Sequence, residues 1–239
     1  MGNGEHLHKT FWRPLHRATV NYHLIEVLVF LFLIVPSMVL SLVGQRLGQM
    51  DFTSVAIAVM VRDLALVNLV FYLIWRNGES LKSLGWVWKN HERDLMLGVI
   101  LFLPFVFGAN YLESLLRSLG LSAPPAGTVP AFLSVHGPGE IVLGLVLVIV
   151  VALAEETMFR GYLLLRFQGA GLGPWGAAVL ASVIFALGHG YEGEAGIVTV
   201  GFMGLAFALI YLWRGSLVAP CVMHFLQDFA GIILPALLK

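Results

Sequence analysis

Long runs of apolar residues alternate with short polar segments along almost the whole chain. Most runs contain about 20 residues, the length that an α-helix needs to cross the hydrocarbon core of a bilayer. The pattern predicts an all-α polytopic bundle of about seven transmembrane helices, over residues 22–43, 54–75, 95–116, 141–167, 174–189, 195–213 and 217–238.

The polar connections between these runs predict the orientation of the chain. Residues 1–21 are polar and basic, and the run that follows is too long for the apolar core of a signal peptide, so we expect it to be retained. Lys and Arg favour the cytoplasmic side, and their distribution predicts a cytoplasmic N-terminus. Nine of them fall in segments on the same side of the membrane as the N-terminus (Lys9, Arg13, Arg17, Arg76, Lys82, Lys89, Arg93, Arg166 and Arg214), and three fall in segments on the other side (Arg46, Arg117 and Lys239).

Composition agrees with a membrane protein and excludes several other classes. The chain is 59% hydrophobic and 12% charged, whereas soluble domains contain about 25% charged residues. Its formal net charge is zero, so no basic surface predicts nucleic-acid binding, and the expected surroundings are the lipid bilayer. The single cysteine, Cys221, excludes an internal disulfide and a cysteine-based zinc cluster.

Ionisable residues interrupt the apolar pattern mainly in the C-terminal half. A charge inside a membrane costs about 3 kcal/mol or more, so each one needs a partner or a function. Glu156 and Arg160 are four residues apart and share a helix face, whereas Glu155 projects about 100° away and has no local partner. An unpaired carboxylate in apolar surroundings suits a general base. A buried ion network that only fixes helix packing would give the same pattern.

Two further polar groups follow in the next apolar runs. His189 ends the short run 174–189 between two glycines, which permit close backbone approach, although a histidine at a helix end can also be a plain interfacial residue. His224 and Asp228 lie one helical turn apart, where they can form an oriented pair, bind a metal or join two helices. Polar groups in neighbouring apolar helices must meet or stay unsatisfied. We therefore predict one site among the C-terminal spans, with Glu155, Glu156, His189, His224 and Asp228 as catalytic candidates and Arg160 as a structural ion-pair partner.

The order and spacing of these groups resemble a known family. Glu155-Glu156-x-x-x-Arg160, Phe185-x-x-x-His189 and His224-x-x-x-Asp228 are similar to the three motifs of the CPBP intramembrane proteases, which include the type II CAAX prenyl endopeptidases and the Abi proteins. The resemblance covers about residues 139–234. It implies a catalytic helical core at residues 139–239, whereas the cytoplasmic segment and three spans expected in residues 1–138 rest on hydropathy alone.

The resemblance also implies roles for individual residues. In the family, the first Glu and the second-motif histidine activate a water, which implies Glu155 and His189, and the third motif handles the carbonyl oxygen, which implies His224 and Asp228. CAAX proteases usually have Asn where this chain has Asp228. An ionised Asp cannot donate a hydrogen bond, so it would have to be protonated, orient the histidine or bind a metal. Glu155, His189 and His224 offer three zinc ligands, and the sequence leaves open whether zinc is used.

The expected function is that of an intramembrane endopeptidase acting on a peptide or protein at or in the membrane. CAAX-type prenylated substrates are the family default. One alternative is a catalytically inactive relative that acts as a membrane scaffold or a bacteriocin-immunity protein. A second is a proton or ion pathway, suggested by Arg62 and Asp63 in the second run, although we interpret this adjacent pair as structural. The sequence does not define the oligomeric state.

Overall fold

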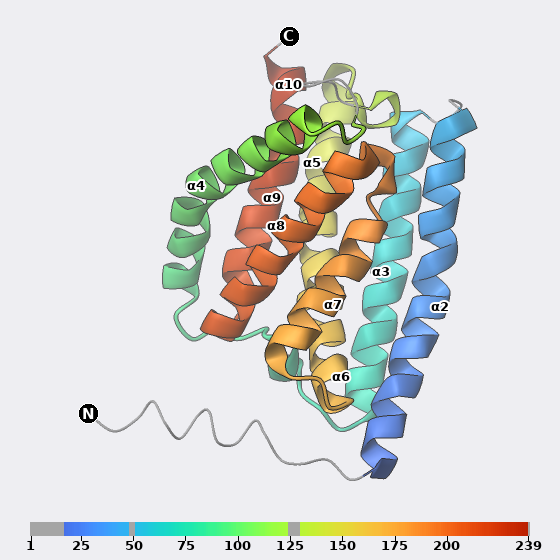
Figure 1. Cartoon of the computed structure of the whole chain (residues 1–239), viewed down its shortest axis with the longest axis vertical. Helices are drawn as coiled ribbons and strands as arrows, with labels where there is room; N and C mark the ends of the chain where they lie inside the picture. The colour runs from blue at the N-terminus through green and yellow to red at the C-terminus, as the bar shows by residue number, and fades with distance from the viewer. Residues whose placement is uncertain (1–16, 48–50, 124–129, 239) are drawn as a thin grey trace.

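The computed structural model describes residues 17–47, 51–123 and 130–238, and the regular structure in these ranges is helical (Figure 1). The all-α class predicted from the sequence is therefore confirmed. Most of the predicted N-terminal cytoplasmic segment lies outside the described residues. The helices are α2 (Arg17–Leu47), α3 (Phe52–Arg76), η1 (Leu81–Leu84), α4 (His91–Ser118), η2 (Ala131–Leu133), α5 (Gly137–Glu155), η3 (Glu156–Leu163), α6 (Leu164–Gly169), α7 (Pro174–Leu187), η4 (Gly190–Glu192), α8 (Gly193–Arg214), α9 (Val218–Asp228), η5 (Phe229–Ile233) and α10 (Leu234–Leu237).

Six segments in the described part of the chain are long and apolar enough to cross a membrane, so the protein is an integral multi-pass membrane protein. The seventh expected run forms the shorter helix α7, with 14 residues. At about 1.5 Å per residue it spans roughly 21 Å, less than the roughly 30 Å hydrocarbon core. The six long segments are Val20–Val39, Phe52–Arg76, His91–Ser118, Gly137–Gly169, Gly190–Arg214 and Val218–Leu237.

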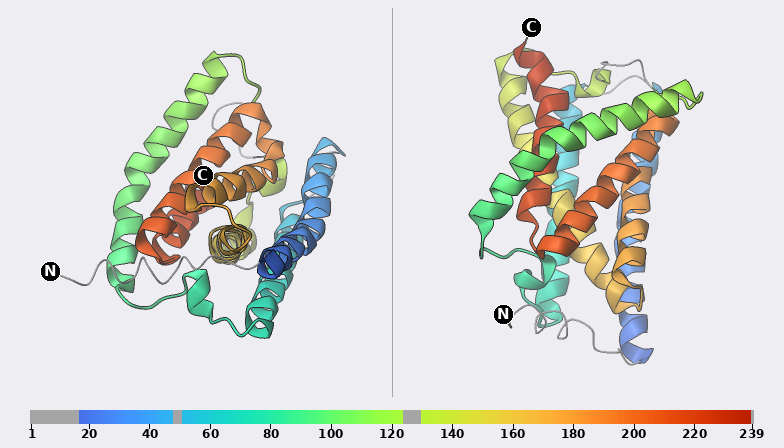
Figure 2. Two further views of the ribbon diagram at one scale, coloured as in Figure 1. Left: turned by 60° about the horizontal axis from the view of Figure 1, so that its bottom comes forward. Right: turned by 60° about the vertical axis from the view of Figure 1, so that its left-hand side comes forward.

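The segment formed by α5, η3 and α6 runs through the middle of the bundle (Figure 1). Helix α3 packs against α5, α4 packs against α8 and α9, and α7 packs against α8. Helices α2 and α4 lie on opposite sides of the bundle (Figure 2). Large apolar side chains such as Phe32, Phe107 and Trp213 are exposed on the outer faces. In a bilayer these faces contact lipid, and the polar side chains are left for the interior.

A π-helical segment, η3, continues α5 at the centre of the bundle. Glu155 is the last residue of α5 and Glu156 the first of η3, and all eight residues of η3 are buried. The chain passes very close to η1 here, because a Cβ atom added at Gly161 would lie 2.9 Å from the carbonyl oxygen of Leu84. π-Helical turns inside α-helices are frequent at functional sites because they re-aim side chains.

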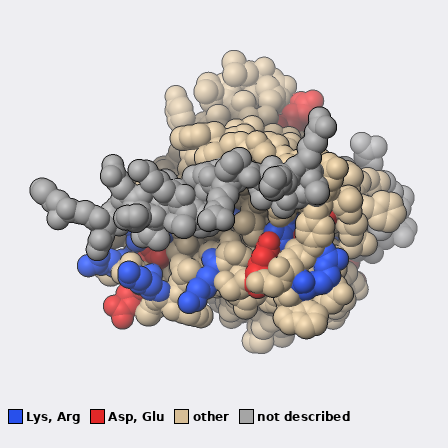
Figure 3. All heavy atoms as spheres, turned by 90° about the horizontal axis from the view of Figure 1, so that it is seen from below, with Lys and Arg blue, Asp and Glu red and all other residues tan. Residues whose placement is uncertain are grey.

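A polar cluster joins α2, α3 and α6 at the end of the bundle where α2 begins. The buried carboxylate of Glu26 lies 2.7 Å from Arg76 and 2.6 Å from Arg166, and it also accepts a hydrogen bond from Tyr162. Arg166 makes a second ion pair with Glu79, at 2.8 Å. Lys and Arg side chains spread over this end of the molecule in Figure 3. The cluster fixes the lower part of α2 to the bundle.

At the opposite end of the bundle, helix α3 begins with a capped first turn. The Asp51 side chain accepts hydrogen bonds from the backbone N–H and the hydroxyl of Ser54, at 2.9 and 2.7 Å. These bonds favour the ionised carboxylate and hold the pKa of Asp51 below its ordinary value. The start of α3 is therefore well defined, and so is the position of the side chains that follow along it.

Candidate active site

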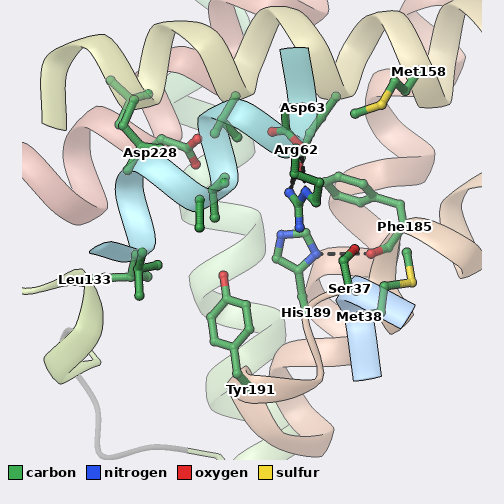
Figure 4. A pocket seen from close by; sticks show the side chains of 18 of the residues that line it. Ser37, Met38, Arg62, Asp63, Leu133, Met158, Phe185, His189, Tyr191 and Asp228 are labelled. Atoms are coloured by element: carbon green, nitrogen blue, oxygen red, sulfur yellow. Dashed lines mark hydrogen bonds and ion pairs between the residues drawn. The ribbon is translucent and has the colours of Figure 1, made fainter. Parts of the chain in front are cut away.

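Two adjoining cavities lie in the bundle, the larger mainly among α2, α3, α5 and α9 and the smaller mainly among α4, α8 and α9. The larger has a volume of about 420 Å³, and the polar side chains of its wall come from α2, α3, α5, α9 and the segment that follows α7 (Figure 4). The smaller, of about 330 Å³, shares part of this wall. The polar lining residues of the larger cavity are Ser37, Arg62, Asp63, Glu155, His189, Tyr191, His224 and Asp228, and both cavities are lined by Phe185, His189, Tyr191, His224 and Asp228.

Glu156 is completely buried and has two ionic partners. Its Oε1 accepts from Nη1 of Arg160 at 2.8 Å and lies 2.8 Å from Nδ1 of His224. The Arg160 guanidinium is itself buried and stacks over the Phe185 ring, with 4.3 Å between its Cζ and the ring centroid. Glu156 is therefore neutralised inside the bundle and does not line either cavity.

Glu155 is also buried, and it differs from its neighbour in its position on the cavity wall and in its longer distances to cations. It lines the larger cavity, and its buried Oε2 has no hydrogen-bond partner in the described part of the protein. The same oxygen lies 3.8 Å from Nε2 of His224, and Oε1 lies 3.8 Å from Nη2 of Arg62. Both distances are longer than a direct hydrogen bond. Glu155 thus keeps acceptor capacity that a ligand in the cavity can use.

His224 is surrounded by three carboxylates. Nδ1 faces Glu156, and Nε2 lies 3.5 Å from Oδ2 of Asp228 and 3.8 Å from Glu155. The ring is held between Phe185 and Phe207, with centroid distances of 6.1 and 5.9 Å. Since every neighbouring polar group is an acceptor, the surroundings match an imidazole that carries N–H on both nitrogens.

His189 follows the short helix α7 and reaches the same cavity wall from the other side. Its Nδ1 lies 3.1 Å from the carbonyl oxygen of Phe185, which can only accept, so Nδ1 is the donor and Nε2 remains free. The chain is tightly packed before it, because a Cβ atom at Gly188 would lie 3.2 Å from the same oxygen. His189 meets Glu155 and His224 as a neighbour on the cavity wall and not through a direct hydrogen bond.

Sequence reasoning did not include Arg62 and Asp63 in the site, yet both line the larger cavity. Figure 4 shows the Arg62 side chain between Asp63 and the His189 ring. Both residues come from α3, about 90 positions before Glu155 in the sequence. The one available signal was the presence of two adjacent ionisable residues in an apolar span, which marks a functional position as readily as a structural one.

The predicted zinc ligands Glu155, His189 and His224 are not arranged as a metal site. Within the described ranges, no group of three or more His, Cys, Asp or Glu side chains is placed to hold a metal ion. The described side chains therefore do not form the predicted zinc site. No step of the reaction proposed below uses a metal.

Comparison with known proteins gives a family match over the region that carries these residues. Residues 137–230 match the model of the family described as type II CAAX prenyl endopeptidase Rce1-like. The matched region includes Glu155, Glu156, His189, His224 and Asp228, and leaves out Arg62 and Asp63. No curated protein and no solved structure gave a match to the chain. The family resemblance recognised in the three motifs is confirmed.

Proposed function

Because residues 137–230 match the Rce1-like family, we propose that the protein is an intramembrane endopeptidase that hydrolyses a peptide bond with water activated by Glu155 and His189. The observation that carries this proposal is the difference between the two adjacent carboxylates. Glu156 lies outside both cavities and its Oε1 pairs with Arg160 and His224 at 2.8 Å, whereas Glu155 lines the larger cavity and lies 3.8 Å from its nearest cationic partners. A carboxylate with free acceptor capacity next to a cavity is suited to remove a proton from water.

In the proposed first step, Glu155 accepts a proton from a water molecule in the larger cavity. His189 orients that water through its free Nε2, since its Nδ1 is occupied by the Phe185 carbonyl. The water oxygen attacks the scissile carbonyl carbon and forms a tetrahedral intermediate. When the C–N bond breaks, the protonated Glu155 returns the proton to the leaving amine, which restores the carboxylate.

His224 stabilises the carbonyl oxygen during this reaction. With Nδ1–H directed at Glu156, its second N–H lies at the cavity wall and can donate to the developing oxyanion. Asp228 lies 3.5 Å from the same nitrogen and orients the ring as an acceptor. This role needs only an acceptor, so it explains how an Asp can work where CAAX proteases usually have an Asn.

The cavities support a substrate with an apolar part. Apolar side chains make up most of the larger cavity wall, many of them from α2, α3 and α5, and they would bury a membrane-associated peptide segment or a prenyl group. The smaller cavity adds Glu113, Arg117, Glu192 and Gln227 to the shared wall. We therefore place the apolar part of a CAAX-type or other membrane-associated substrate in the larger cavity. The apolar lining residues include Ile34, Met38, Val55, Val59, Leu147 and Val151.

We also propose that the N-terminus is cytoplasmic, on the basis of the Lys and Arg distribution. The larger cavity is lined by the first part of α3 and by η2 and η4, which lie at the end of the bundle opposite to the start of α2 (Figure 1). In this orientation the site lies in the non-cytoplasmic half of the membrane. An impermeant maleimide added to intact cells should label an introduced Ser122→Cys and not Lys82→Cys, and the opposite pattern would invert the orientation. Cys221, which is buried, gives little background.

The test of the proposed function is peptide cleavage by purified protein in liposomes. Glu155→Gln should lower the rate at least about 100-fold, the usual contribution of a general base. Glu140→Gln is the matched control, because Glu140 is a carboxylate at the start of the same helix. It accepts hydrogen bonds from the Thr53 hydroxyl and from the backbone N–H of His136. Undiminished cleavage by Glu155→Gln would remove Glu155 from the chemistry. Absence of cleavage by the natural protein on prenylated and unmodified peptides alike would favour the non-catalytic scaffold.

A further inference from the structure

We propose that Arg62 and Asp63 of α3 are positioning residues that hold Glu155 in its reactive orientation. The inference rests on the proposed function and extends it to a helix outside the region that matches the family. It gives each residue of the Glu155–Glu156 pair an arginine of its own. Arg160 of the same segment holds Glu156, and Arg62 of another helix holds Glu155.

Asp63 fixes the position of the Arg62 guanidinium. Its side chain has no exposed surface, and its Oδ1 accepts from Nε of Arg62 at 2.8 Å and from Nη2 at 2.7 Å. Two contacts from one carboxylate oxygen to two nitrogens of a planar group restrict how that group can turn. A buried carboxylate of this kind needs its cation, so the pair behaves as one unit.

The Arg62 guanidinium held in this way faces Glu155. Its Nη2 lies 3.8 Å from Oε1 of Glu155, while Oε2 of the same carboxylate is directed at His224. The Arg62 side chain is 30% exposed, and it extends into the larger cavity in Figure 4. One oxygen of Glu155 is thereby directed at a fixed cation and the other at the reaction centre.

The consequence of losing Arg62 follows from this arrangement. Glu155 would be free to turn and to close the 3.8 Å gap to His224, where it would pair with the imidazole that is meant to stabilise the carbonyl oxygen. Neither residue would then be placed for its step. The apolar wall that binds the substrate would remain, so the chemical step should suffer and substrate binding should not.

The experiment compares Arg62→Ala, Arg62→Lys and Asp63→Asn for peptide cleavage by full-length protein. A displaced catalytic group can cost about 100-fold, so we expect Arg62→Ala to lower kcat by about that factor, with KM changed less than about threefold. Arg62→Lys should keep at least about a tenth of the activity, because it retains the charge. The kcat of Asp63→Asn should lie between those of Arg62→Ala and Arg62→Lys, because the guanidinium loses the carboxylate that holds it.

Chemical rescue separates positioning from a structural role. Arg62→Ala leaves space beside an existing cavity, so added methylguanidinium should restore kcat at least about tenfold. Arg160→Ala is the matched control, since Arg160 is 1% exposed and lines neither cavity, and methylguanidinium should not rescue it. If Arg62→Ala fails to fold, Arg62→Gln, which keeps most of the side-chain volume, takes its place.

Three outcomes would overturn the proposal. The first is a kcat for Arg62→Ala within threefold of the natural value, and the second is a folded, inactive Arg62→Ala or Arg62→Gln that methylguanidinium does not rescue. The third is proton flux across liposomes that Asp63→Asn abolishes while cleavage continues, which would assign the pair to a proton pathway. Failure of the natural protein to cleave any peptide would count against the proposed function itself and is distinguishable from all three.

Discussion

Replacement of Arg160 by Met tests how the site is held together. The Arg160 side chain is 1% exposed and its partner Glu156 is fully buried, with 2.8 Å between Nη1 and Oε1. Methionine keeps a long side chain that can still pack against Phe185, so the substitution removes the charge without opening a large cavity. What remains is a buried carboxylate that has lost its arginine.

The magnitude follows from the burial of both partners. Breaking a buried ion pair by removing one member costs about 3–5 kcal/mol, and Glu156 would keep only its contact with His224. For a chain of this size each kcal/mol lowers Tm by roughly 2–4 °C, so Arg160→Met should melt roughly 6–20 °C below the natural protein. The stacking of the guanidinium on Phe185, at 4.3 Å, places the expected value toward the upper part of that range.

A double-mutant cycle identifies the cause of the loss. Thermal unfolding in detergent would be followed for Arg160→Met, Glu156→Gln and the double variant. Gln at 156 can still accept from His224 and no longer needs a cation, so the double variant should recover at least half of the stability that Arg160→Met loses. A Tm for Arg160→Met within 2 °C of the natural protein, or a double variant as unstable as the sum of the single ones, would refute the reasoning.

Two further predictions concern Asp228 and Gly161. Asp228→Asn should retain peptide cleavage within about tenfold and Asp228→Leu should lose about 100-fold or more, because the amide keeps an acceptor toward the imidazole; equal losses in both variants would show that the negative charge is required. Gly161→Ala should lower the free energy of unfolding by about 1–3 kcal/mol, since its Cβ would lie 2.9 Å from the Leu84 carbonyl oxygen. Gly139→Ala, whose Cβ meets no atom within 4 Å, should change it by less than about 0.5 kcal/mol in chemical denaturation.

The helices and the C-terminal part of the site could be predicted from the sequence because both depend on local patterns. Apolar runs of bilayer length mark the spans, and a charge in such a run stands out. The helical spacing also separates Glu155 from Glu156, and the two carboxylates have different partners in the structure. The division of the chain at residue 138 and the catalytic roles remain predictions.

Depth in the membrane and partners from distant helices could not be predicted in this way. Straight full-length spans would have left His189 and His224 at different depths. The short α7 and the π-helical η3 change the path of the chain, and hydropathy detects neither. The pairing of Arg62 with Glu155 depends on the packing of α3 against α5, which periodicity does not report. What the sequence patterns do not report is therefore the packing of helices that are distant in the sequence.

The origin of each arginine gives the two carboxylates different sensitivity to packing. Arg160 belongs to the same continuous segment as Glu156, so their separation is set by the segment itself. Arg62 reaches Glu155 from α3, so that distance changes whenever α3 shifts along α5. Gly144 lies in this interface, where an added Cβ atom would be 3.3 Å from Phe52 of α3 and 2.6 Å from Ile233. A change in packing there would alter the surroundings of Glu155 while leaving the pair of Glu156 and Arg160 intact. The carboxylate that we propose as the general base is therefore the one whose position depends on the fold of the whole bundle.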